Sequence, residues 1–157
     1  MKPKIGISEK NLNTNAALLS TILADEVTLY IKTRKYHWNV KGESFMELHK
    51  LFQDQYVELE EIVDLVAERI NKLGHRTIGT MKEFLEITRL KESPDKYPDQ
   101  SEMIKDLLED HEAIISFTRN DIEFLNEKSK DFGSIDFITG ILEQHESISW
   151  VLRRYLN

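Results

Sequence analysis

The chain has 157 residues, a formal net charge of −7 and no cysteine. The acidity argues against a body that grips DNA, because phosphate binding depends on lysine and arginine contacts, and it favours the attraction of cations. The lack of cysteine excludes disulfides and metal sites built on thiolates. The length predicts one domain over residues 1–157, with residues 1–8 as a short flexible tail. No apolar run reaches the length of a signal-peptide core or a membrane span, so we expect a cytoplasmic protein without a membrane partner.

The first helical pattern starts close to the N-terminus. From about Ser8 or Asn11, apolar side chains recur at three- and four-residue spacing, as on one face of an α-helix. The pattern predicts a helix that runs to about Asn39, after which Gly42 interrupts it.

A second apolar stripe predicts one long helix over residues 44–73. Ser44 and Glu47 have the spacing of a capping box, in which each side chain bonds to the other residue's backbone at the start of a helix. Gly74 follows the last apolar position, where glycine often ends a helix in a left-handed conformation.

A short helix and two further long helices complete the pattern. Thr80 and Glu83 have the spacing of another capping box, and the short helix that they open is expected to end near Thr88. Two prolines then mark a loop, a third long helix is predicted from about Ser101, and Ser134 is predicted to cap a fourth. The expected fold class is all-α: a ferritin-like four-helix bundle with a short extra helix in the crossover between helices two and three.

Two carboxylates and a histidine share the second predicted helix. Asp64 and Glu68 are four residues apart, so their side chains lie on one face and can point at one ion. His49 precedes Asp64 by fifteen residues. That separation corresponds to about 22 Å at a helical rise of about 1.5 Å per residue, which no shared ion can bridge within one chain.

The same residues can meet across a twofold axis. His49 and Asp64 differ by only about 60° in azimuth, so they face nearly the same side of the helix. Two copies packed antiparallel about an axis near Tyr56 to Glu58 would bring His49 of one copy opposite Asp64 and Glu68 of the other. We therefore predict a metal site that is split between two subunits and occurs twice per dimer.

The ligand types narrow the choice of metal. His37 and His49 are twelve residues apart and lie on different predicted helices. Each alone is more often a packed or surface histidine, and Asp64 and Glu68 alone are compatible with a solvated helix face. Together, two imidazoles and carboxylates without sulfur suit Fe(II), Mn(II) or Zn(II), with positions left open for oxygen or peroxide. No histidine has a glutamate three residues before it, so we do not expect a conventional di-iron centre within one subunit.

The chain resembles the Dps family, the DNA-binding proteins from starved cells, also called mini-ferritins. The resemblance rests on H-W-N-V-x-G-x-x-F-x-x-L-H at residues 37–49 and D-x-x-A-E-R at residues 64–69, and it extends to the later GTMKEFLE and HESISWVLRRYL segments. It implies a homo-oligomeric shell of twelve subunits that oxidises Fe(II), preferably with hydrogen peroxide rather than oxygen, and stores ferric oxide. The implied ligands, listed by subunit, are His37 and His49 from one chain and Asp64 and Glu68 from its partner.

Two further sites are implied by the resemblance. The family often has an acidic residue four positions after the second histidine, where this chain has Gln53, followed by Asp54. A neutral amide binds a hard cation less strongly than a carboxylate, so we expect a weak second iron position. Acidic residues near the start of the fourth helix line iron channels in the family. Asp136 is the best positional match here and Asp131 a weaker one, with surface solvation as the alternative.

Two functions remain open at this point. One is a ferroxidase that stores iron; the other is a nucleoid-associated, DNA-protecting shell with weak or no ferroxidase activity. The tail offers only Lys2 and Lys4, so we expect DNA binding to be weak or absent. Trp38 is interpreted either as a core residue or as a scavenger of stray radicals beside His37. The remaining histidines are interpreted as structural: His75, His111 and His145.

Overall fold

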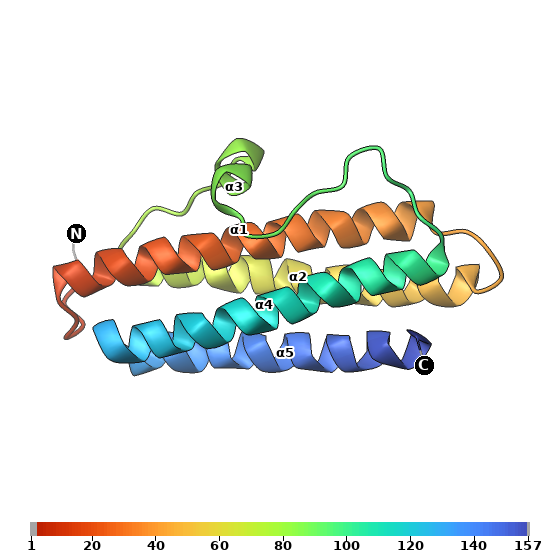
Figure 1. Cartoon of the computed structure of the whole chain (residues 1–157). Coiled ribbons are helices and arrows are strands. Elements are labelled where there is room, and N and C mark those ends of the chain that lie inside the picture. Colours follow the sequence, from red (N-terminus) through yellow and green to blue (C-terminus); the bar gives the residue numbers. More distant parts are fainter. Residues whose placement is uncertain (1–2, 157) are drawn as a thin grey trace.

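The computed structural model describes residues 3–156 as four long helices side by side, with a short fifth helix outside them (Figure 1). The helices are α1 (Glu9–Asn39), α2 (Phe45–Lys72), α3 (Met81–Ile87), α4 (Gln100–Lys128) and α5 (Phe132–Leu156). The described residues form no strand, so the predicted all-α bundle with a short helix between the second and third long ones is confirmed. Residues 1 and 2 of the predicted tail, including Lys2, lie outside the described part.

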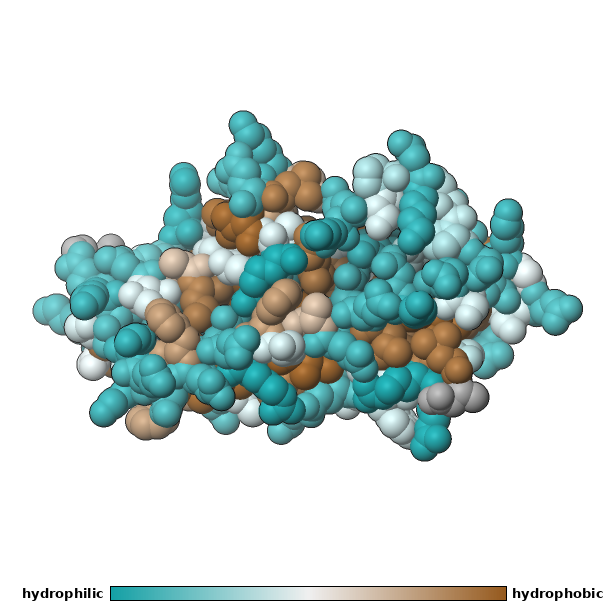
Figure 2. All heavy atoms as spheres, viewed as in Figure 1, coloured by the Kyte–Doolittle hydropathy of each residue, from teal (hydrophilic) through white to brown (hydrophobic). Residues whose placement is uncertain are grey.

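The long helices pack as two pairs, α1 with α2 and α4 with α5, and α3 lies against α1. Each long helix turns its apolar stripe toward the others, and the core lies between the pairs. Its fully buried side chains include Leu23, Phe52, Leu107 and Ile138. Figure 2 shows a mostly hydrophilic outer face, with apolar atoms visible beside α3 and in stretches along the bundle beneath it. No helix within residues 3–156 is long and apolar enough to cross a membrane.

One arginine after α3 fixes the crossover to the bundle. The Arg89 guanidinium donates to the Asp25 carboxylate of α1 at 2.7 Å and to Asp121 of α4 at 2.9 Å. Asp25 is only 1% exposed. Burial raises the pKa of the Asp25 carboxyl, and Arg89 opposes that rise because it stabilises the charged form. The short helix is therefore held against the bundle by a largely buried ion pair as well as by apolar contacts.

Two of the predicted helix ends are confirmed. Thr80 caps α3, with its side chain accepting from the Glu83 backbone N–H while the Glu83 carboxylate accepts from the Thr80 N–H. Gly74 follows the last residues of α2 with a φ of 82°. This left-handed conformation lets its N–H and that of His75 bond back to the final turn of the helix, which ends α2.

The predicted capping box at the start of α2 is wrong. Ser44 stands at the cap position but makes no side-chain capping bond, and its φ of −93° and ψ of 23° are not extended as such a bond requires. Glu47 faces a different partner, because its carboxylate accepts a hydrogen bond from the Tyr155 hydroxyl at 2.7 Å. A tertiary contact with the C-terminal helix has replaced the local one.

The predicted cap of the last helix is wrong as well. The helix begins at Phe132, so Ser134 lies inside its first turn. Asp131 does the capping instead: its carboxylate accepts from the Ser134 N–H at 3.2 Å and from the Ser134 hydroxyl at 2.6 Å. Aspartate is as good a cap as serine, and the two side chains here bond to each other.

Candidate metal centre

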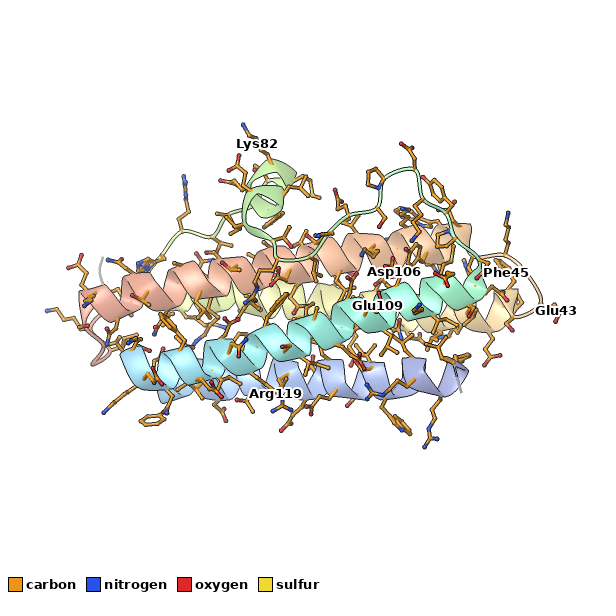
Figure 3. The ribbon with its side chains drawn as sticks, in the orientation of Figure 1. Glu43, Phe45, Lys82, Asp106, Glu109 and Arg119 are labelled. Atoms are coloured by element: carbon orange, nitrogen blue, oxygen red, sulfur yellow. The ribbon has the colours of Figure 1, made fainter. Side chains whose placement is uncertain are left out.

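His37 and His49 meet where α1 turns into α2. His37 lies in the last turn of α1 and His49 in the second turn of α2. The connection is short and bends at Gly42, whose φ is 123°. Figure 3 shows Glu43 and Phe45 of this turn at one end of the bundle. The imidazole rings stack with their centroids 3.8 Å apart and their planes 20° apart.

Each of the two imidazoles is held by the backbone of the other residue. The His37 Nδ1 lies 2.8 Å from the His49 carbonyl oxygen, and the His49 Nδ1 lies 2.9 Å from the His37 carbonyl oxygen. A carbonyl oxygen only accepts, so both Nδ1 atoms carry hydrogen and donate. In the neutral rings both Nε2 atoms therefore keep their lone pairs, which is the tautomer that binds a metal through Nε2.

Two aromatic side chains pack against the imidazole rings of His37 and His49. Tyr56 meets His37 edge-on with centroids 5.2 Å apart, and Phe45 lies 5.1 Å from His49. His37 is buried and His49 is half-buried, so one side of the pair remains open to solvent. Of the two interpretations of Trp38, that of a core residue is wrong, because its side chain is 63% exposed; that of a radical scavenger stays a prediction.

Asp64 and Glu68 lie on the exposed face of α2, away from the histidine pair. Glu68 accepts from Lys72 at 2.9 Å, and Asp64 lies in a shallow hollow that it shares with Glu60, Glu61 and Leu65. Across residues 3–156, no three histidine or acidic side chains are arranged to hold one metal ion. A single chain thus brings the two histidines together and leaves the two carboxylates apart from them. That a partner chain supplies the carboxylates stays a prediction.

Gln53 and Asp54 are both exposed, in the helical turn that follows His49. Asp54 forms an ion pair with Lys50 on the surface of the same helix. Gln53 is four residues after His49, so it follows that histidine by one turn on the same face of α2.

The two candidate channel residues differ in their surroundings. Asp131 is buried, accepts from Asn15 at 3.0 Å and from Ser134, and lies 3.8 Å from the Arg69 guanidinium. Its carboxylate is thus occupied within its own chain. Asp136 is exposed one turn into α5. A channel role for either residue stays a prediction.

Two of the histidines interpreted as structural form a cluster that the sequence analysis missed. His111 of α4 and His145 of α5 are fully buried, and their Nδ1 atoms lie 2.8 Å apart. Glu26 of α1 joins them through His145. His75 is separate and half-buried, with its Nε2 2.8 Å from Asn13 Oδ1. The signal was present in the pattern, because both buried histidines fall on the apolar stripe of their helices.

Comparison with known proteins gives consistent matches along the chain. Residues 16–157 match the model of the ferritin-like domain. A low temperature-induced protein of Nostoc sp. is 38% identical over 152 residues, which are 97% of this chain and 85% of the relative. DNA protection during starvation protein 2 of Bacillus anthracis is 33% identical over 141 residues, 89% of this chain and 94% of the relative. The solved structure of a Dps protein from Vibrio cholerae O1 has a TM-score of 0.92 and 28% identity, covering 100% of this chain and 98% of that one.

Proposed function

Because the chain belongs to the Dps family of ferritin-like proteins, we propose that it is a ferroxidase that stores iron. Fe(II) is the substrate, and it is oxidised by hydrogen peroxide, or more slowly by oxygen, at sites shared between two subunits. The ferric product is stored in a closed cytoplasmic shell of twelve chains. The ligands are, in chain order, His37, His49, Asp64 and Glu68.

The observation that carries this proposal is the pair of reciprocal hydrogen bonds between His37 and His49. Each Nδ1 is already bonded to a carbonyl oxygen, at 2.8 Å and 2.9 Å. Both rings are thereby oriented before any metal arrives, so little side-chain entropy is lost on binding. The Nε2 atoms take no part in these bonds, and no residue within 3–156 is seen to bond to them, so both are available to a metal ion.

The carboxylate half of the proposed site is accessible. The ion pair of Glu68 with Lys72 joins side chains that are 55% and 60% exposed. Such a pair on a helix surface contributes only about 0.3 to 0.5 kcal/mol, so a divalent cation displaces the lysine readily. Exposed apolar side chains on α2 support the packing of a second copy against this helix; they are Met46, Val57 and Leu65.

The proposed chemistry follows from the ligand types. Neutral imidazole nitrogens suit Fe(II), and the carboxylates of Asp64 and Glu68 stabilise the harder Fe(III) ion that forms. Hydrogen peroxide takes one electron from each of two Fe(II) ions and leaves as two hydroxide ions. Tyr56 and Phe45 keep the two rings in place during this change, because they pack against His37 and His49.

Mixed assemblies of single variants test whether the site is shared. His49→Ala and Asp64→Ala should each abolish fast Fe(II) oxidation by peroxide in stopped-flow measurements. In a dimer of one chain of each kind, one site lacks both side chains and the other is intact. Random reassembly of equal amounts should therefore restore about a quarter of the sites, since half of the dimers are mixed.

The matched control mixes His37→Ala with His49→Ala. Both changes affect the same half of the site, so every site in a mixed assembly lacks one histidine and no activity should return. Equal recovery in the two mixtures, or no recovery in either after reassembly is verified, would contradict the shared site.

DNA protection is the second candidate function, and it is favoured by the name of the Bacillus anthracis relative. In this chain the formal net charge of −7 opposes it, because an acidic body repels phosphate. A gel-shift titration with plasmid DNA distinguishes the ferroxidase function from the DNA-protecting function.

A further inference from the structure

Three ionisable side chains lie in the centre of the bundle and take no part in the proposed iron chemistry. Glu26 of α1, His145 of α5 and His111 of α4 are each 0% exposed. The His145 Nε2 lies 2.9 Å from Glu26 Oε1, and the His145 Nδ1 lies 2.8 Å from the His111 Nδ1. We call these three residues the buried triad. It connects the α1/α2 pair to the α4/α5 pair through the core.

The triad is a line of hydrogen bonds rather than a cage for an ion. His145 uses one nitrogen for each neighbour, so the three side chains do not converge on one point. This agrees with the absence, among residues 3–156, of any three such groups placed to hold a metal. The two ends of the line, Glu26 Oε2 and His111 Nε2, are buried and have no hydrogen-bond partner within the described part of the chain. The three side chains can therefore bind protons, although they are not arranged to bind a metal ion.

The hydrogen bonds of the triad permit only some protonation states of its two imidazoles. With both imidazoles neutral, His145 donates from Nε2 to Glu26 and accepts at Nδ1 from His111. With one added proton, imidazolium His145 donates to both neighbours and its charge is balanced by the Glu26 carboxylate. A second added proton on the imidazoles puts hydrogen on both Nδ1 atoms, which face each other at 2.8 Å. That state loses the hydrogen bond and places two positive charges side by side in the core.

We propose that the buried triad is an acid-sensitive connection between the two helix pairs, which holds while its imidazoles carry at most one added proton and opens when His111 takes up the second. Within the triad, His111 faces His145 of α5, which in turn faces Glu26 of α1. The charged group that faces the triad from α2 is Glu58, which interacts with His145. The proposal does not depend on the iron chemistry proposed above, since none of these residues contacts the histidine pair of the candidate site.

The direction of the effect follows from the surroundings of His111. Burial, and then the neighbouring His145, hold the pKa of His111 well below its ordinary value. A group with a lowered pKa in the folded state contributes stability that is present above its unfolded pKa of about 6.5 and is lost as the pH falls below it. Burial raises the pKa of Glu58, and that group acts in the opposite sense, with stability lost as the pH rises. Of these two groups, only His111 contributes a loss of stability as the pH falls.

His111→Asn tests this connection. Asparagine places an amide where the Nδ1 of histidine stood, so it can still bond to His145, but it takes up no proton in this pH range. Urea unfolding of the assembled protein, followed by circular dichroism from pH 7.5 to 5, gives the number of protons taken up on unfolding. We expect the variant to take up about one proton per chain fewer than the wild type near pH 5.5. The control His75→Asn removes a half-buried histidine outside the triad. It should not lower the number of protons taken up on unfolding as His111→Asn does.

A second measurement needs no variant and decides the question if His111→Asn does not fold. Deuterium exchange at the imidazole C2–H, read by mass spectrometry of the wild-type protein, reports the titration of each histidine. His111 should remain neutral well below pH 6.5 until the fold opens. Titration of His111 near its ordinary pKa in the folded protein would overturn the proposal, and so would equal proton uptake on unfolding by wild type and His111→Asn.

Discussion

Gln53 is exposed one helical turn beyond His49, on the face of α2 that carries the histidine. A neutral amide at this position offers one weak oxygen donor, whereas a carboxylate would offer a charge and two oxygens. Asp54 is paired with Lys50, so its negative charge is already partly balanced. At the scale of one residue, we therefore expect Gln53 to limit how firmly a second iron ion is held at each proposed site.

Gln53→Glu should tighten the binding of the second Fe(II) and leave the first nearly unchanged. The substitution adds a carboxylate at almost constant volume, and a hard cation prefers that donor. Anaerobic calorimetric titration with Fe(II) resolves the two events. Asp54→Asn is the matched control, because it removes a charge from the neighbouring position without placing a donor beside His49. Two irons of similar affinity in the wild type would show that Gln53 does not limit binding.

At the scale of helices, much of the fold could be predicted from periodicity because apolar stripes depend on residues close in the chain. The start of α2 could not, because Glu47 is taken by Tyr155 from the other end of the sequence. The cap of α5 was missed for a similar reason: Asp131 is fixed by Asn15 and Arg69, which belong to other helices. Local rules predict which residues can cap a helix, and tertiary contacts decide which of them do.

The candidate site, too, could be predicted only where it depends on residues close in the chain. The approach of His37 to His49 follows from a short helix–turn–helix, so a sequence motif can anticipate it. Reciprocal bonds from each Nδ1 to the other residue's carbonyl oxygen could not be anticipated, because they depend on the angle between α1 and α2. Nothing local indicates that His145 faces Glu26, since the two residues are 119 positions apart.

Arg89→Ala should destabilise the fold by about 2 to 4 kcal/mol. The change leaves the Asp25 carboxylate, which is 1% exposed, without its cation, and an unpaired buried charge costs several kcal/mol. Urea unfolding at neutral pH measures the loss. Arg119→Ala is a suitable control, because its ion pair with Glu146 joins side chains that are 59% and 43% exposed, and the expected change is below about 1 kcal/mol. A similar small change in both variants would mean that Arg89 does not fix the crossover.

At the scale of the whole molecule, several large apolar side chains remain exposed on the single chain. Phe132 is 70% exposed, Trp150 is 57% exposed and Met46 is 74% exposed, and they lie on two different helices. Burial of such side chains against further copies of the chain is favourable, which supports the proposed assembly. A closed assembly satisfies such surfaces without open-ended growth, because each contact is repeated by symmetry.

Light scattering should therefore find a closed homo-oligomer, and the family indicates twelve chains. The expected mass is twelve times the 18.4 kDa of one chain, and it should not change with protein concentration in the micromolar range. Trp150→Glu places a charge on one of the exposed apolar surfaces and should shift the population toward smaller species, whereas Tyr97→Glu, on the loop before α4, should not. A monomeric wild-type protein at micromolar concentration would rule out both the shell and the shared site.

DNA binding should be absent or weak at about 0.15 M salt, since an acidic assembly repels phosphate and the tail offers few lysines. A gel-shift titration with plasmid DNA in the absence of added metal measures this directly. The comparison to make is with a variant in which Lys2 and Lys4 are both replaced by alanine. Retardation by the wild type at sub-micromolar concentration, abolished in that variant, would favour the DNA-protecting function instead.

The reciprocal bonds between His37 and His49 also bear on the order of events during synthesis. The two residues are only twelve positions apart, so the α1–α2 hairpin can form and pair them before α4 and α5 have left the ribosome. If the site is shared as proposed, its histidine half can exist early, in a chain that has no partner. Its carboxylate half would reach it only when two finished chains dock. Iron oxidation would then begin only after assembly, and a newly made chain would carry no reactive centre while there is no cavity to receive the ferric product.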